Sequence, residues 1–216
     1  MKPMIFAGAL ALAFALTAST PLLAADPAPA ATPASTAPAA PKLHAAMRGL
    51  WQGHIQHTRE YAMAVKSGNS AAAKKAADDV VANAKQISDA VAGFYGADAG
   101  KRMLELLAGH WGAVKAMTDA EKAGDTSASA KAMQDATANA NDIAKFLSGA
   151  NPNLPEDAVR GLMMTHVGHH SAQIGEIMKG DSKAEATTWT AMQSHMNTLA
   201  DALSDGIAKQ FPAKAS

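Results

Sequence analysis

The chain has 216 residues, and its 19 basic and 19 acidic side chains balance to a formal net charge of +0. No basic stripe is present, so nucleic acid is not an expected partner. Cysteine is absent from the sequence, which excludes disulfides, thiolate metal sites, cysteine nucleophiles and covalently attached c-type haem. Aromatic residues make up 5% and methionine occurs 12 times, as is typical of helices packed through small and flexible side chains.

The N-terminal segment predicts export. Lys2 precedes an apolar run from Ile5 to Leu16, and Ala24-Ala25-Asp26 offers a cleavage point. This is the pattern of a secretory signal peptide over residues 1–25. The apolar run is short for a transmembrane helix, so we expect no stable membrane span after cleavage and a periplasmic or secreted protein.

The next segment is low in complexity. Residues 26–41 alternate Pro and Ala with small polar residues and predict a disordered tether. The folded domain is then expected over residues 42–212, with a short tail over 213–216.

Within this domain, apolar residues recur every three or four positions in six successive segments, which is the period of helices with one buried face. These stripes cover residues 43–65, 80–94, 103–117, 133–146, 159–177 and 189–207. No segment alternates with period two, so we expect no sheet. The sequence predicts an all-α fold of six helices.

The helical segments repeat with a period of 56 residues. Three histidines recur at this spacing, and each is followed by a glycine and an Asn or Asp that end one helix and cap the next. The histidines are His54, His110 and His166, and the glycines are Gly68, Gly124 and Gly180. An ungapped repeat of this kind predicts three tandem helical hairpins forming one six-helix bundle.

Each repeated histidine is level with a residue on the other helix of its hairpin, because both lie roughly 21 Å from the turn at about 1.5 Å per residue. The facing residue is Asn83 for His54, Asn139 for His110, and His195 in the third hairpin. For the two His–Asn pairs we expect structural hydrogen bonds, since a buried imidazole needs a partner.

The third hairpin concentrates imidazoles. His170 lies one turn beyond His166 on the same helix face, and His195 faces them from the other helix. Three imidazoles with an open position form the ligand set of many zinc sites, and imidazole also suits copper. The sequence therefore predicts a Zn or Cu site at His166, His170 and His195. Additional candidate ligands are His169, Met163 and Met192, whose thioethers would favour Cu(I).

A second geometry uses the repeat itself. If the three hairpins close around a pseudo-threefold axis, His54, His110 and His166 fall at one level and face that axis. If the hairpins stack as an open solenoid, these three side chains are too far apart to share an ion.

A different function remains open at this point: a structural or protein-interaction module whose histidines are hydrogen-bonded internally, with methionines as core filler. An enzyme is not favoured, because the nearest carboxylate on the same helix, Glu176, lies more than a turn past His170. The sequence specifies no protein partner.

Several short motifs resemble those of a family of uncharacterised, exported, all-helical bacterial proteins that are often loosely labelled glycosyltransferases. The matching motifs are Trp51-Gln52-Gly53-His54, Phe94-Tyr95-Gly96, Phe146-Leu147-Ser148-Gly149-Ala150-Asn151-Pro152, His195-Met196 and Gln210-Phe211-Pro212. The resemblance implies that His54, Arg59, His110, His166 and His195 are family features. The sequence does not support the glycosyltransferase label, because it contains neither a sheet pattern nor a DxD-type acidic motif.

One helix carries a second resemblance. The spacing His166-x-x-x-His170-x-x-Gln173-Ile174 is similar to the metal-binding helix of DinB-like four-helix bundles. This resemblance too implies metal binding by His166 and His170.

Overall fold

The computed structural model describes residues 40–215. The expected signal peptide, and the expected tether up to residue 39, lie outside the described residues. Pro41, expected at the end of the tether, is instead the first residue of a helix. Proline suits this position because the first amide of a helix has no intrahelical partner to lose.

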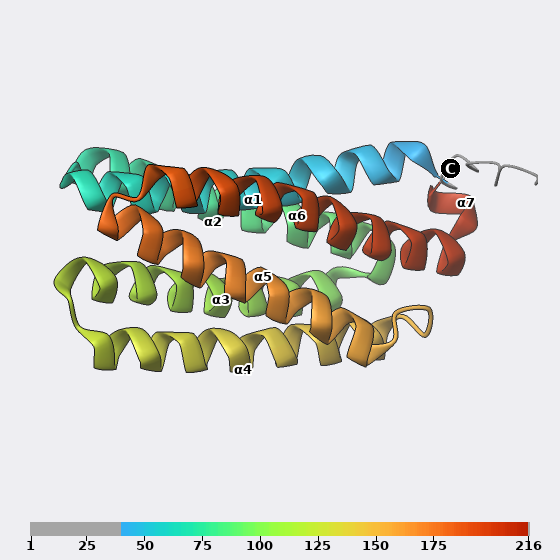
Figure 1. The fold of residues 1–216 in the computed structure, drawn as a ribbon. Helices are drawn as coiled ribbons and strands as arrows, with labels where there is room; N and C mark the ends of the chain where they lie inside the picture. The colour runs from blue at the N-terminus through green and yellow to red at the C-terminus, as the bar shows by residue number, and fades with distance from the viewer. Residues whose placement is uncertain (1–39, 216) are drawn as a thin grey trace, which may run out of the picture. The chain divides into compact units, whose positions relative to one another are not determined.

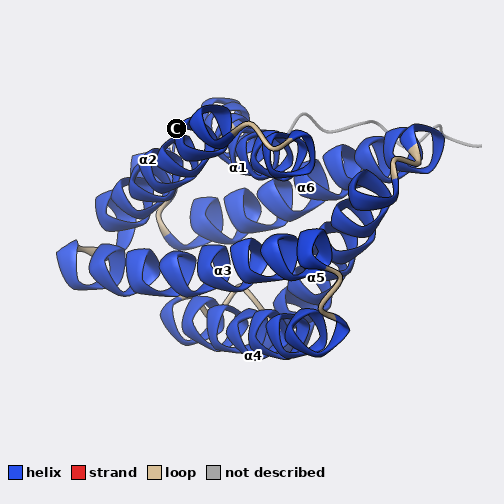
Figure 2. Cartoon of the chain, turned by 90° about the vertical axis from the view of Figure 1, so that its left-hand side faces the viewer, coloured by secondary structure: helices blue, strands red, loops and turns tan. Residues whose placement is uncertain are grey.

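The described part of the chain is helical, with no strand between residues 40 and 215 (Figure 1, Figure 2). The elements are α1 (Pro41–Ser67), α2 (Ser70–Tyr95), α3 (Ala97–Ala123), α4 (Thr126–Ala150), α5 (Glu156–Lys179), α6 (Ser182–Gln210) and α7 (Pro212–Ala215). The all-α prediction is confirmed. The segment expected as a tail differs, because most of it forms the short helix α7 after Pro212.

The apolar stripes become the buried faces of the helices. On α1, for example, the expected stripe members Met47, His54, Thr58 and Tyr61 are buried, whereas Leu50 is only partly so. Such faces exclude water along the whole length of the bundle, and the resulting hydrophobic core draws on all six long helices.

Three of the helix–helix turns have the same construction. A glycine with positive φ ends the first helix, and the next residue caps the second helix through its side-chain oxygen. The glycines are Gly68, Gly124 and Gly180, and the capping residues are Asn69, Asp125 and Asp181. Only glycine adopts this backbone conformation without steric cost, so the turns are fixed locally by sequence.

The six long helices form a closed ring rather than an open solenoid. Helices α1, α3 and α5 contact one another at the centre. Helix α2 packs against α1 and α3, α4 against α3 and α5, and α6 against α5 and α1 (Figure 1). This closure places the middle segments of α1, α3 and α5 around one shared interior.

None of the helices between residues 40 and 215 combines the length and the apolar composition that a membrane span needs.

Candidate metal centre

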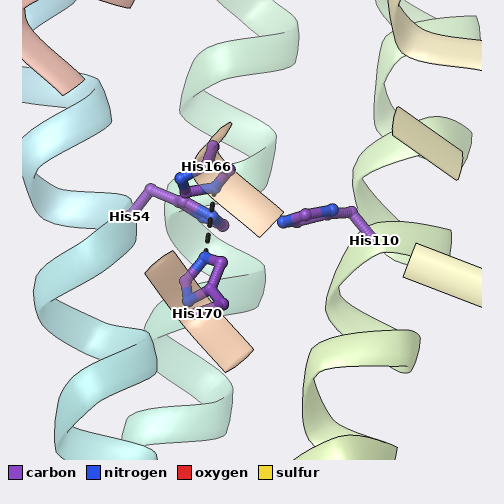
Figure 3. Close-up of side chains that lie close together, drawn as sticks. All are labelled: His54, His110, His166 and His170. Atoms are coloured by element: carbon purple, nitrogen blue, oxygen red, sulfur yellow. Dashed lines mark hydrogen bonds between the residues drawn. The ribbon is translucent and has the colours of Figure 1, made fainter. Parts of the chain in front are cut away.

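Four histidines meet in this interior, one from α1, one from α3 and two from α5 (Figure 3). The imidazole centroids of His54, His110 and His166 lie 5.3–5.7 Å apart. The ring of His170 lies 4.4 Å from that of His166 and 5.7 Å from each of the other two. The three helices thus bring together residues that are far apart in sequence.

The geometry of this cluster is close to that of a metal-binding site. One nitrogen from each histidine lies within 4.8 Å of the nitrogens from the other three. Around a tetrahedral ion with bonds of about 2.0–2.1 Å, ligand nitrogens are about 3.4 Å apart. The four nitrogens would therefore have to move closer together to share one ion.

The cluster is shielded from solvent. Its four side chains are between 1% and 3% exposed. The group contains no carboxylate, so no fixed negative charge within it favours protonated imidazoles.

Burial keeps these histidines neutral. It lowers the pKa of His54 to about 3, helped by repulsion from His110 and His57. It also lowers the pKa of His110 to about 4, an effect that the side chain of Asn139 partly opposes. The pKa values of His166 and His170 fall well below the ordinary value, first through burial and then through repulsion from the other histidines. Neutral imidazole carries the lone pair that binds metal.

Most of the hydrogen-bonding capacity of the cluster is unused. Nε2 of His170 lies 3.1 Å from Nε2 of His166, a hydrogen bond in which one ring donates and the other accepts. Four other buried nitrogens have no hydrogen-bond partner within residues 40–215: Nε2 of His54, Nδ1 and Nε2 of His110, and Nδ1 of His166. Unpartnered polar atoms in a core are costly, so this concentration calls for a ligand or another explanation.

The expected His–Asn hydrogen bonds are not formed at full hydrogen-bond geometry, although Asn139 lies close enough to His110 to raise its pKa. Asn83 and Asn139 each donate their Nδ2 to a backbone carbonyl of the facing helix, at 3.0 Å. The accepting residues are Leu50 and Leu106. The amide reaches the backbone because a glycine lies beside it, and a Cβ at Gly109 would approach Asn139 Nδ2 to 2.9 Å.

His195, predicted as a metal ligand, lies outside the group of four. Its Nε2 donates to the carbonyl of Leu162 at 2.9 Å, which is the same 33-residue contact that Asn83 and Asn139 make in their hairpins. The structure therefore brings together two of the three predicted ligands, His166 and His170. It adds the two residues expected from closure about an axis, His54 and His110.

The remaining candidate ligands are placed as follows. His169 faces His195 across α5 and α6, with ring centroids 5.3 Å apart. Met163 and Met192 are buried in the hydrophobic core, the position that packing alone would give them.

A second group was not anticipated from the sequence. His57, Glu60 and Asp79 lie close together on the surface of α1 and α2. Their polar atoms are already engaged, since His57 Nδ1 lies 3.1 Å from Glu60 and Asp79 forms an ion pair with Lys75. The i,i+3 spacing of His57 and Glu60 is a signal that could have indicated the first contact.

Comparisons with known proteins give no relative: no family model, curated protein or solved structure matches the chain. Functional inference therefore depends on the site itself.

Proposed function

We propose that this protein binds one transition-metal ion, zinc or copper, through His54, His110, His166 and His170. The observation that carries the proposal is the set of unpartnered imidazole nitrogens, buried together without a carboxylate. A single ion at their centre would satisfy one nitrogen from each ring and repay the burial of four polar groups.

The ligand set supports binding rather than catalysis. Four imidazoles complete a tetrahedral zinc site, whereas catalytic zinc keeps one position for water or substrate. Imidazole also suits copper, and the set offers no thiolate that would select a softer metal. A closed, buried site favours buffering, carriage or sensing of the metal over turnover.

The arrangement is most simply explained by three copies of one hairpin. The same contact, from residue 83, 139 or 195 to a carbonyl 33 residues earlier, recurs in each hairpin. The glycine turns recur at the same spacing. We include the 56-residue tandem repeat in the proposal, because a closed ring of three copies places one equivalent histidine from each beside the axis.

Export is a further part of the proposal. It is motivated by Lys2, the apolar run over residues 5–16 and the small residues before Asp26. Membership of the exported helical family noted above is compatible with it. N-terminal sequencing of the protein recovered from the periplasm or medium should begin near Asp26, and an uncleaved cytoplasmic product would contradict export.

One observation favours the alternative of an interaction module with internally satisfied histidines, namely the bond between His166 and His170. That alternative requires similar partners for His54 and His110. The nitrogens named above have none at hydrogen-bond geometry, although Asn139 interacts with His110 and raises its pKa. It predicts no metal affinity above that of surface histidines.

The test is a competition titration of the purified protein with Zn(II), Cu(II) and Cu(I) against chelators of known affinity. We expect one tightly bound ion per chain. His110→Leu should weaken binding by on the order of 100-fold or more, because it removes a ligand and not merely its support. The matched control is His57→Ala, which removes a histidine outside the cluster whose side chain is 30% exposed. This variant should bind as the wild type does. Equal binding by His110→Leu and wild type would overturn the proposal.

A further inference from the structure

A second pair of histidines lies at the interface of α5 and α6. His169 and His195 are both partly exposed, unlike the four buried histidines. Their ring centroids are 5.3 Å apart and their planes are inclined by 64°. His169 is adjacent in sequence to His170, so the pair lies immediately outside the buried cluster.

The hydrogen bond of His195 fixes which of its nitrogens is free. The carbonyl of Leu162 can only accept, so Nε2 of His195 carries the hydrogen of the 2.9 Å bond. In the neutral ring, Nδ1 then carries the lone pair, and no hydrogen bond to it occurs within residues 40–215. An imidazole that donates one nitrogen to a backbone carbonyl and presents the other is the usual form of a metal ligand.

Comparison with the other hairpins shows that holding this carbonyl does not require a histidine. Asn83 and Asn139 make the equivalent bonds with their amides, each at 3.0 Å. At position 195 the imidazole makes the same bond and adds a basic nitrogen that an amide lacks. The third hairpin therefore keeps the contact to the carbonyl and gains a nitrogen that can bind a ligand.

His169 supplies the second nitrogen. Its Nδ1 is buried without a hydrogen-bond partner in the described part of the chain. Two imidazoles that face each other at a partly exposed interface can bind a cation whose other positions are filled by water.

We infer that His169 and His195 form an outer metal site that takes up the ion from solvent and passes it to the buried cluster. The transfer role rests on the proposed function, although the outer site can exist without it. Two ligands bind more weakly and exchange faster than four. Leu162, which anchors His195, lies one turn before His166 on α5, so the outer and inner ligands are adjacent along one helix.

The outer site is tested by the rate at which metal-free protein takes up Zn(II) from a fluorescent zinc chelator in stopped flow. The main variant is Thr165→Gly with His195→Asn, which gives the third hairpin the residues that the other two have at these positions. The glycine is needed because a Cβ at the equivalent Gly53 or Gly109 would crowd the asparagine amide. Thr165→Gly alone is the matched control, and His169→Gln is a second variant that leaves the Leu162 bond in place.

Uptake should slow by about tenfold or more in the double variant and in His169→Gln, with unchanged stoichiometry and equilibrium affinity. Uptake at the control rate would overturn the inference. A loss of affinity at an unchanged rate would also overturn it, because His195 would then be a ligand of the final site.

A last experiment separates this inference from the proposed function. In His110→Leu, where the buried site is disabled, Zn(II) should still perturb the imidazole NMR signals of His169 and His195 weakly and reversibly. If the wild type shows the same weak perturbation and binds no ion tightly, the proposed function is refuted and the outer site is supported. Tight binding by the wild type with no perturbation in His110→Leu would refute the outer site alone.

Discussion

Two regions of the molecule bury histidine in opposite ways. His44, near the start of α1, is 6% exposed, as deeply buried as many core residues. Its Nδ1 lies 2.9 Å from Asp201 and its Nε2 lies 3.0 Å from Asp205. Arg48 also binds Asp201, so the group links α1 to α6 through a network of charges. The central cluster buries four imidazoles with one mutual hydrogen bond and no carboxylate.

The difference indicates what each region is for. Where His44 joins α1 to α6, each of its nitrogens lies within hydrogen-bond distance of a carboxylate, so neither is left without a polar partner. In the central cluster the nitrogens point at one another, an arrangement that helps stability little without an ion.

Acid should unfold the metal-free protein steeply. The unfolded chain takes up protons at the ordinary histidine pKa near 6.5, whereas in the fold the pKa of His54 is about 3 and that of His110 about 4. Stability is therefore complete above pH 6.5 and falls as the pH drops from there toward 4. Between its folded and unfolded pKa values, each such histidine lowers the free energy of unfolding by about 1.4 kcal/mol for each unit of pH decrease.

Denaturant titrations across this pH range measure the slope. The double variant His54→Leu with His110→Leu lacks the two titrating groups, so its free energy of unfolding should depend less steeply on pH. A variant slope equal to that of the wild type would mean that the cluster is already protonated or hydrated in the fold.

Metal should stabilise the protein by about 2.7 kcal/mol at a free concentration 100 times the dissociation constant. Scanning calorimetry should show a rise of several degrees in the Tm of the wild type. The rise should vanish in His110→Leu and persist in His44→Leu, which begins from a lower Tm. An equal rise in all three proteins would place the ion somewhere other than the cluster.

Leucine substitutions should have opposite effects in the two regions when metal is absent. His44→Leu removes two charge-assisted hydrogen bonds and should destabilise the protein by about 1–3 kcal/mol at pH 7.5. His110→Leu replaces an imidazole that has no partner and should be neutral or stabilising by up to about 1 kcal/mol. Similar losses in both variants, measured by chemical unfolding, would show that the cluster is a structural network after all.

The smallest effect concerns the packing beside the cluster. Gly109→Ala would place a Cβ 2.9 Å from the amide nitrogen of Asn139 and disturb its bond to Leu106. Its matched control is Gly112→Ala on the same helix, where nothing lies within 4 Å of the added Cβ. The control should gain helix propensity, so Gly109→Ala should be less stable than it by about 1–2 kcal/mol. Equal unfolding midpoints would rule out this role for the glycine.

Local features of the fold could be predicted from sequence because they depend on neighbouring residues. The positive-φ glycines and their capping neighbours, such as Gly124 with Asp125, determine where helices end. The stripe on α1 predicted its buried face. Helix α7 was missed because a helix of four residues that begins at a proline is too short to show a periodic pattern.

Long-range features could not be predicted in the same way. Apolar stripes are compatible with both a closed ring and an open stack, and the contacts of α1 with α5 and α6 distinguish them. Arg59 pairs with Glu185 on α6, 126 residues away, rather than with the adjacent Glu60. That partner depends on closure of the ring.

The site was predicted in part for the same reason. His166 and His170 share one helix face, so their proximity follows from helix geometry alone. The addition of His54 and His110 depends on closure, which the repeat suggested as one of two geometries. His195 was predicted as a metal ligand, but it bonds to the carbonyl of Leu162 instead. Residue spacing does not indicate which acceptor an imidazole binds.

The most direct test of the central claim is X-ray absorption spectroscopy of the protein loaded with one equivalent of zinc. We expect a first shell of four nitrogens at about 2.0–2.1 Å with the multiple scattering of imidazole rings. A shell dominated by oxygen with one or two imidazoles, or one containing sulfur near 2.3 Å, would contradict a four-histidine centre.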